Sequence, residues 1–289
     1  MKPAAFEYVA PTTVDETLDV LAKHGEDAKI LAGGQSLVPL LNFRMARPAL
    51  LVDVNGVDGL DGVYREDGTL YLGARTREAV LERSAVVGEH WPVLSEAAGQ
   101  IGHPAIRNRG TVGGSVAHAD PAAELPVVLT ALDARFRMRS AAGERTLDAA
   151  SFFVSYLTTA LRPDELLVEI QVPALGETTG CAFREYARLH GDFALAGAAA
   201  VVDLDARGRC GRVRLALLGA GGTPVRAHAA EDALLGRTPD DSECARAADL
   251  AASESEPPSP VDHRRALLAE FARRALVTAA GRARKDGKR

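Results

Sequence analysis

The chain has 289 residues, 47% of them hydrophobic and 25% charged, a balance typical of a globular protein large enough for two or three packed units. Its formal net charge of −5 disfavours nucleic-acid binding, which needs a clustered basic excess. No stretch is long and apolar enough to span a bilayer or to act as a secretory signal, and the three cysteines lack the spacing of a disulfide framework or an iron–sulfur cluster, so we expect a cytoplasmic protein.

The first 56 residues predict a small α/β unit. Thr13 to Glu16 has the form of a capping box, and apolar residues then recur at helical spacing until Gly25. A short apolar run at 28–32 predicts a strand that leads into a glycine pair, and residues 50–54 predict a second strand.

Residues 57–176 predict a second unit in which strands and helices are mixed. Residues 134–139 alternate between apolar and charged side chains, which indicates a strand with one solvated face. Residues 91–101 show helical spacing, and a strand expected at 166–172 ends before Pro173.

Residues 177–289 predict a separate α+β unit. Three β-rich runs with turn residues between them predict a three-stranded antiparallel sheet, at 181–189, 196–204 and 213–218. Helices follow, the last of them beginning at Asp262 with one apolar face. The basic residues 282–289 predict a solvated tail.

Two glycine pairs are the most informative feature of the chain. Gly33-Gly34 follows the strand expected at 28–32, and Gly113-Gly114 follows Thr111-Val112. A glycine pair lets the backbone turn tightly and present consecutive N–H groups to an anion without a Cβ in the way. Two such loops in one chain therefore predict a clamp on the diphosphate of a dinucleotide cofactor.

Other nucleotide and metal sites fit the sequence less well. A strand at 214–218 runs into a glycine-rich turn, but Pro224 stands where a Rossmann fingerprint needs its third glycine, and neither glycine pair continues as a P-loop. His118 and Asp120 lack converging ligands, with Glu124 the only further local candidate, so no metal site is assigned. No nucleophile or acid–base centre is legible, so no catalytic residue is assigned. This favours an electron carrier whose cofactor supplies the reactivity.

Longer stretches around the glycine pairs resemble one family. They are Ala32-Gly33-Gly34-Gln35-Ser36-Leu37-Val38-Pro39 and the segment from Arg107 to Pro121, with later matches from Phe183 to Ala194 and from Gly219 to Ala227. Over nearly the whole chain they resemble the FAD-binding medium subunit of the molybdenum hydroxylases, the family of xanthine dehydrogenase and aerobic carbon monoxide dehydrogenase.

The resemblance implies an α+β fold. It consists of a two-subdomain FAD-binding fold like that of vanillyl-alcohol oxidase (the PCMH type), with subdomains at 1–56 and 57–176. A C-terminal α+β domain of the carbon monoxide dehydrogenase flavoprotein type follows at 177–289, with a three-stranded antiparallel sheet and helices.

The resemblance also implies which residues bind FAD. Those on the pyrophosphate are Ala32, Gly33, Gly34, Gln35, Ser36 and Leu37 from the first segment and Thr111, Val112, Gly113, Gly114 and Ser115 from the second, where Ser115 replaces a frequent Asn or Asp. Ala117 and Asp120 belong to the same set, Glu124 falls where the family places an acidic residue on the adenosine ribose, and Ile101 falls where some relatives stack an aromatic ring on the adenine.

Three residues are implied near the isoalloxazine. Leu167 matches an apolar residue that packs against the ring, Arg184 falls where some relatives place a lysine, and Phe193 matches an aromatic position over the flavin. Leu167 is equally compatible with a core position, and Arg184 with a surface position on a strand.

The function implied is electron transfer within a heterotrimer. Noncovalent FAD on this chain would accept electrons from two [2Fe-2S] clusters on a small subunit and pass them to an external acceptor. A large subunit would carry molybdopterin, and the whole would be a dimer of heterotrimers. Two alternatives stay open: a stand-alone flavin oxidase or reductase with His190 or Tyr186 as its base, and an assembly protein that has lost the cofactor, which the intact glycines disfavour.

Overall fold

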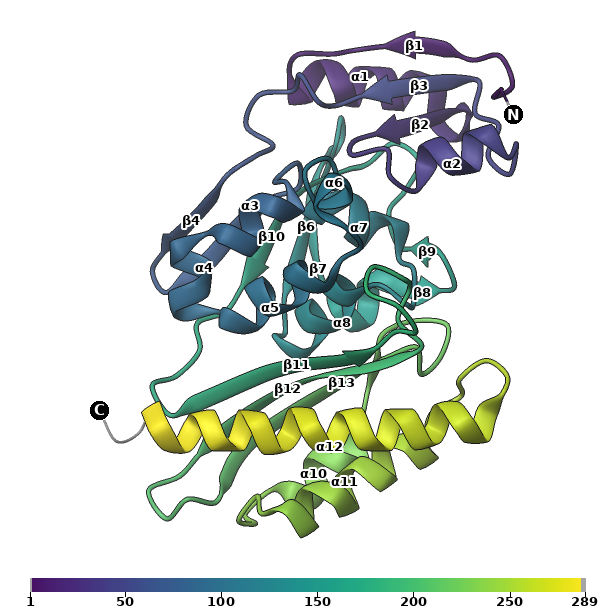
Figure 1. Cartoon of the computed structure of the whole chain (residues 1–289). Coiled ribbons are helices and arrows are strands. Elements are labelled where there is room, and N and C mark those ends of the chain that lie inside the picture. The colour runs from purple at the N-terminus through teal and green to yellow at the C-terminus, as the bar shows by residue number, and fades with distance from the viewer. Residues whose placement is uncertain (1, 287–289) are drawn as a thin grey trace.

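The structure, a computed structural model, describes residues 2–286. Figure 1 shows three stacked units: a small N-terminal sheet with its helices, a middle unit built on a second sheet, and a C-terminal sheet covered by the long helix α12 (Val261–Asp286). Among the described residues, no helix combines the length and the apolar character that crossing a membrane requires.

The N-terminal unit is a parallel three-stranded sheet with two α-helices. The strands β1 (Glu7–Val9), β3 (Leu50–Asp53) and β2 (Ala28–Leu31) lie in that order. The helices are α1 (Val14–His24) and α2 (Leu37–Asn42), and a 3-10 turn, η1 (Gly25–Asp27), follows α1. The capping box is confirmed, because the Thr13 hydroxyl accepts a hydrogen bond from the Glu16 N–H at 3.1 Å and the Glu16 carboxylate accepts one from the Thr13 N–H.

The middle unit has a five-stranded antiparallel sheet in the order β4-β5-β10-β6-β7. Its strands are β4 (Val63–Glu66), β5 (Thr69–Gly73), β6 (Arg135–Ser140), β7 (Gly143–Asp148) and β10 (Leu166–Val172). Its helices are α3 (Glu78–Arg83), α4 (Ala85–His90), α5 (Pro92–Gln100), α6 (Pro104–Arg107), α7 (Val112–His118), α8 (Glu124–Ala131) and α9 (Ala149–Phe152), and β8 (Phe153–Ser155) pairs with β9 (Thr158–Thr159). The predicted strands at 134–139 and 166–172 and the helix at 91–101 are confirmed.

Strand β10 joins the first two units because its two faces enter different cores. Leu166 and Val168 pack with α1 and β3 of the N-terminal unit, whereas Leu167 and Ile170 pack in the large core of the middle unit. Leu167 and Ile170, three residues apart, reach the same core because the pairing of β10 with β6 has a β-bulge between Leu167 and Glu169.

The C-terminal unit is an antiparallel sheet in the order β11-β12-β13-β14, with helices on one face. Its elements are β11 (Thr179–Tyr186), β12 (Ala196–Leu204), β13 (Cys210–Leu218), β14 (Val225–Arg226), α10 (His228–Leu234), α11 (Asp241–Ser253) and α12. The three expected strands are present, and the two-residue β14, which the sequence did not indicate, extends the sheet. Because β13 pairs only with antiparallel neighbours, the glycine-rich turn after it is not part of a Rossmann unit.

The C-terminal sheet lies between α12 and the middle unit. Alternate residues of β11 and β12 face opposite ways: Ala182 and Ala198 pack toward α12, and Phe183 and Ala199 toward the core of the middle unit. Residues 282–286 continue α12 instead of forming the expected solvated tail, because the Arg282 guanidinium binds the Cys181 carbonyl at 2.6 Å. Residues 287–289 of that tail lie outside the described residues.

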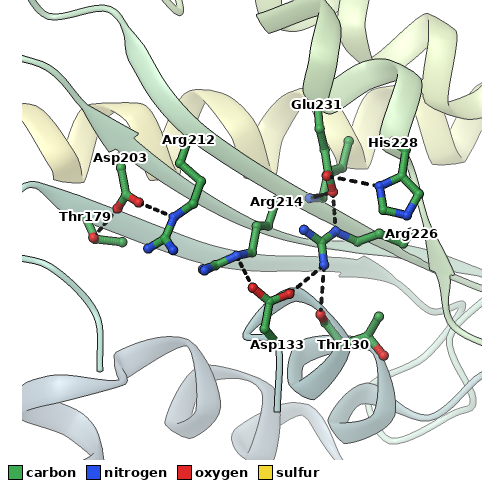
Figure 2. A network of polar contacts seen from close by, with 10 residues as sticks. Thr130, Asp133, Thr179, Asp203, Arg212, Arg214, Arg226, His228 and Glu231 are labelled. Atoms are coloured by element: carbon green, nitrogen blue, oxygen red, sulfur yellow. Dashed lines mark hydrogen bonds and ion pairs between the residues drawn. The ribbon is translucent and has the colours of Figure 1, made fainter. Parts of the chain in front are cut away.

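A polar network fixes the C-terminal sheet to the middle unit (Figure 2). Asp133, in the turn between α8 and β6, forms ion pairs with Arg214 at 2.5 Å and with Arg226 at 2.8 Å. Arg226 also pairs with Glu231, whose carboxylate accepts the Leu215 N–H at 2.8 Å. Each buried charge in this network therefore has a partner of opposite charge, as burial requires.

Candidate functional site

The first glycine segment, residues 32–37, connects the carboxyl end of β2 to the start of α2. Gly34 has φ +71°, a left-handed conformation that glycine adopts without strain. The Gln35 side chain donates to the Gly33 carbonyl at 2.8 Å, and the Asn55 side chain donates to the Ala32 carbonyl at 2.9 Å. Two carbonyl groups of the segment thus accept hydrogen bonds from side chains of the protein itself.

The N–H groups of this segment are available to a ligand. Within residues 2–286, none of the five backbone N–H groups from Gly33 to Leu37 donates a hydrogen bond. Consecutive free N–H groups that lead into a helix form a binding site for phosphate oxygens. The first segment therefore has the donor set expected for a diphosphate.

The second glycine segment, residues 107–115, differs from the first because the N–H groups of its glycines are bound within the protein. The sequence predicts a loop, but Thr111 is the N-cap of α7 and Gly113-Gly114 lies in the first turn of that helix. The Thr111 hydroxyl accepts the Gly114 N–H at 3.0 Å, the Ala74 carbonyl accepts the Gly113 N–H at 2.8 Å, and the Thr76 carbonyl accepts the Val112 N–H at 2.9 Å. The expectation that this segment presents its glycine amides to an anion is therefore wrong for this structure.

The two glycine segments nevertheless meet. A Cβ on Gly33 would lie 2.5 Å from the Arg109 carbonyl oxygen and 2.8 Å from the Gly110 Cα, so the two backbones approach as closely as only glycine permits. Gly113 is equally confined, because its Cβ would lie 2.5 Å from that of Ala74. The Thr111 N–H and the Ser115 hydroxyl face no hydrogen-bond partner elsewhere in the described chain, so both remain available beside the first segment.

Arginine side chains surround the meeting point. Arg77 donates to the Arg109 carbonyl and, at 2.6 Å, to the Asn55 side chain. Burial, followed by repulsion from Arg75 and Arg109, lowers the pKa of Arg77, which reports a cluster of positive charge. Arg109 is exposed and has no carboxylate partner among the described residues. A hollow of about 580 Å³, lined in part by Arg77 and Asn108, adjoins the cluster.

Two family models cover this architecture. One, described as the FAD-binding domain in molybdopterin dehydrogenase, matches residues 4–175, and one, described as the carbon monoxide dehydrogenase flavoprotein C-terminal domain, matches residues 181–279. The chain belongs to the FAD-binding medium subunits of the molybdenum hydroxylases. This confirms the resemblance, the fold class and the assignment to an oxidoreductase.

Relatives of this medium subunit match it along their full length. The 6-hydroxypseudooxynicotine dehydrogenase complex subunit alpha of Paenarthrobacter nicotinovorans is 48% identical over 98% of this chain and 97% of its own. The carbon monoxide dehydrogenase medium chain of Hydrogenophaga pseudoflava is 37% identical over 96% of this chain and 98% of its own. A solved structure of carbon monoxide dehydrogenase from that organism superposes with a TM-score of 0.95 at 40% identity, covering 98% of this chain and 99% of the other.

The residues present in this medium subunit fit the FAD that its family model names. Free N–H groups, a glycine whose Cβ would close the cradle, and Arg109, which has no carboxylate partner in the described chain, all suit a dinucleotide with a negatively charged diphosphate. The family model that names this FAD-binding domain describes it as part of a molybdopterin dehydrogenase. No group of three or more potential metal ligands occurs in the described part of the chain.

The residues expected at the adenosine half include one buried acid, Glu124. Glu124 begins α8 and is buried, and this burial, together with the nearby Asp120, raises its pKa to about 7. Asp120 itself holds the turn before α8 by accepting the Ala122 N–H at 2.8 Å. Ile101 caps the C-terminus of α5 and packs against the large core, and Ala117 lies within α7.

The residues expected at the isoalloxazine are not gathered at the glycine segments. Leu167 is buried in the core of the middle unit. Arg184 pairs with Glu96 at 3.7 Å, and Glu96 also pairs with Arg282 at 2.6 Å. Phe193 lies in the connection between β11 and β12 with 74% of its surface exposed. Their roles at the flavin remain proposals.

The structure also shows where Tyr186 and His190 lie, the residues that a stand-alone flavin oxidase would need as its base. Tyr186 packs against Phe271 of α12, with ring centroids 5.9 Å apart, and His190 lies 6.0 Å from the ring of His103. Burial lowers the pKa of His118, and the negative charge of Asp120 opposes this shift.

Several residues of the site escape sequence reasoning. Asn55, Arg77 and Glu78 contact the two segments through hydrogen bonds or packing but lie 20 or more residues from either glycine pair. One local signal was present: a threonine followed three residues later by the second glycine is the spacing of an N-cap, and it would have indicated the start of α7.

Proposed function

We propose that this medium subunit binds FAD noncovalently and carries electrons between iron–sulfur clusters of a small partner subunit and an external acceptor. The observation that supports this most directly is the row of free N–H groups from Gly33 to Leu37, backed by the segment 107–115. FAD, when bound, supplies the redox chemistry.

The two glycine segments take different parts in this proposal. The N–H groups of Gly33 to Leu37 bind the pyrophosphate, and the Thr111 N–H and Ser115 hydroxyl supply further donors. Gly113 and Gly114 position α7 against β5 and the turn that follows it, so that the first segment has a rigid support. Arg109 and Arg77 add positive charge that favours the diphosphate.

The remaining expected residues keep their proposed roles. Glu124 contacts the adenosine ribose, Ile101 borders the adenine, and Leu167, Arg184 and Phe193 border the isoalloxazine. We also propose that the first FAD-binding subdomain ends at residue 56 and that the second ends at residue 176.

We place this chain in a dimer of heterotrimers with an iron–sulfur subunit and a molybdopterin subunit, acting in the cytoplasm. The family assignment supports the partners, and the buried thiols of Cys210 and Cys244 suit a reducing compartment.

The substrate is set by another subunit in this proposal. Two full-length relatives are named for very different substrates, 6-hydroxypseudooxynicotine and carbon monoxide, although both align with this chain from end to end. Such constancy of one subunit across substrates is expected when it handles electrons alone.

The test is cofactor content in the full chain, purified alone and after co-expression with an iron–sulfur chain and a molybdopterin chain of this family. We expect close to one FAD per chain, with the absorbance of an oxidised flavin, and release of all flavin on acid precipitation. A folded protein without flavin in both preparations would contradict the proposal. Reduction of the bound FAD by a small substrate in the absence of partners would favour the stand-alone oxidase instead.

A further inference from the structure

Glu78 is a buried carboxyl group without a partner. It begins α3 and is 5% exposed, and its Oε2 has no hydrogen-bond partner in the described chain. Neither carboxyl oxygen takes part in an ion pair within residues 2–286. An isolated ionised carboxylate is costly to bury, so such a group favours its protonated form.

The position of Glu78 connects it to the first glycine segment. Its backbone N–H donates to the Gly110 carbonyl at 3.1 Å, and its carboxyl group occupies the space where a Cβ on Gly110 would lie. Gly110 in turn contacts Gly33, whose Cβ would lie 2.8 Å from the Gly110 Cα. The Glu78 carboxyl group therefore lies behind the backbone that supports the free N–H groups.

The charges around Glu78 leave it without a dedicated cation. Burial, followed by the negative charge of Glu124, raises the pKa of Glu78 to about 8, and Arg107 of α6 opposes this rise. The Arg107 guanidinium, however, is bound to Glu82 of α3 through bonds of 2.9 and 3.1 Å.

The other elements packed against α3 contribute charges that are engaged elsewhere. Glu96 of α5 pairs with Arg282 and Arg184, and His90 of α4 contacts Arg65 at 3.2 Å and Glu89 at 3.9 Å. No cation from these elements pairs with Glu78, and neither Arg77 nor Arg109, which flank the contact between Glu78 and Gly110, forms an ion pair with it within residues 2–286.

We propose that Glu78 is a carboxylic acid in the FAD-bound protein, that its proton keeps the support beneath the pyrophosphate neutral, and that loss of this proton opposes FAD binding. The inference rests on the proposed FAD site. A diphosphate placed at Gly33 to Leu37 adds negative charge near Glu78, so binding favours the protonated side chain further. When Glu78 is ionised in the free protein, FAD binding must take up a proton.

The sign of the pH dependence follows. Below the pKa of Glu78, at about 8, the side chain is protonated with or without FAD, and Glu78 contributes no pH dependence to the affinity. Above it, the free protein loses the proton that the bound form retains. Affinity then falls as the pH rises, by at most about tenfold per pH unit for one linked proton.

The experiment is a calorimetric titration of FAD into the full chain, in the preparation that binds FAD, at pH 7 and pH 9. Each pH is measured in two buffers with different ionisation enthalpies, so that the number of protons taken up is obtained. At pH 9 we expect the wild type to take up close to one proton more than Glu78→Gln, at pH 7 we expect no difference between the two, and we expect the wild-type affinity to fall about tenfold from pH 7 to pH 9 relative to the variant. Glu78→Gln removes this one proton and the tenfold fall in affinity that accompanies it, while any proton linked to Glu124 stays the same in both proteins.

Glu185→Gln is the matched control. Burial and the charge of Glu124 also raise the pKa of Glu185 to about 8, and its Oε2 likewise lacks a partner, but Glu185 lies on β11 and not behind the glycine segments. This variant should keep the proton uptake of the wild type.

Three outcomes would overturn the inference: FAD binding to the wild type at pH 9 without proton uptake, persistence of the full wild-type uptake in Glu78→Gln, or its loss in Glu185→Gln. The first and third need no folded Glu78→Gln variant. A wild type that binds no FAD at any pH would contradict the proposed function itself.

Discussion

The two glycine pairs of this subunit look alike in sequence but differ in where their N–H groups point. From Gly33 to Leu37 the N–H groups have no partner within the described chain, whereas those of Val112, Gly113 and Gly114 are all bound to Thr76, Ala74 and Thr111. The first pair lies in a loop before a helix, and the second lies inside one. A glycine pair therefore indicates close backbone approach in both places, but free donors in only one.

The largest expected effect is a loss of stability on substitution in the second glycine pair. In Gly113→Ala the new Cβ would collide with Ala74, 2.5 Å away, and we expect a loss of about 3 kcal/mol in the free energy of unfolding. Gly88→Ala, at an exposed position of α4 with nothing within 4 Å, should stabilise by about 0.5 kcal/mol. Chemical denaturation measures both. Equal stability of the two variants would contradict the packing role of Gly113.

The next effect separates cofactor binding from backbone strain. Gly34→Ala and Gly59→Ala replace glycines with similar φ angles, +71° and +76°, so each should lose about 1 kcal/mol of stability. Only Gly34 lies among the free N–H groups, and its Cβ would press on Val38 and Leu31 at 3.2 and 3.3 Å. We expect FAD affinity to fall about tenfold in Gly34→Ala, equivalent to 1.4 kcal/mol, and not to fall in Gly59→Ala. Fluorescence titration with FAD tests this, and equal affinities would refute the distinction.

A smaller effect concerns the cap of α7. Thr111→Val removes the oxygen that accepts the Gly114 N–H while keeping the side-chain shape, and it should cost about 1 kcal/mol. Thr111→Ser retains the hydroxyl and should remain close to the wild type. Thermal unfolding of the pair compares them, and a stable Thr111→Val would show that the second segment does not depend on its cap.

The last prediction concerns the pH dependence of stability at Glu185, away from the glycine segments. Burial raises the pKa of Glu185 to about 8 from its ordinary value of 4.5, so the folded state holds a proton that the unfolded state has released between these two values. Wild-type stability should therefore fall as the pH rises from 4.5 to 8. Glu185→Gln lacks this proton, so its stability relative to the wild type should rise from pH 4 to pH 8, and the two should be alike at pH 4. Chemical denaturation at both pH values measures this, with Glu177→Gln, at an exposed position, as the control. If Glu185→Gln were more stable than the wild type at pH 4 and not at pH 8, the raised pKa assigned to Glu185 would be wrong.

Local features of the fold could be predicted from the sequence because their causes are local. The capping box at Thr13, the alternating strand of residues 134–139 and the turn after β13 depend on neighbours within a few residues. The FAD-binding family could be recognised because the segments around both glycine pairs are distinctive. These inferences are confirmed by the fold and the family match.

The division of labour between the pairs could not be predicted, because its causes are distant in sequence. Gly113 is bound by Ala74, nearly 40 residues earlier, and Gly33 packs against Arg109, more than 70 residues later. The support of Gly110 by Glu78 is of the same kind. Such contacts arise only once β5, α3 and α7 have packed together, so no motif in either segment encodes them.

The most direct test is residue-resolved hydrogen exchange of the full chain by NMR, with and without FAD. We expect the N–H groups of Gly33 to Leu37 to exchange rapidly in the free protein and to become at least tenfold slower when FAD binds, because they then donate to phosphate oxygens. Those of Val112 to Gly114 should be protected in both states. Rapid exchange of Val112 to Gly114 in the free protein, or FAD binding without slower exchange at Gly33 to Leu37, would contradict the roles assigned to the two segments.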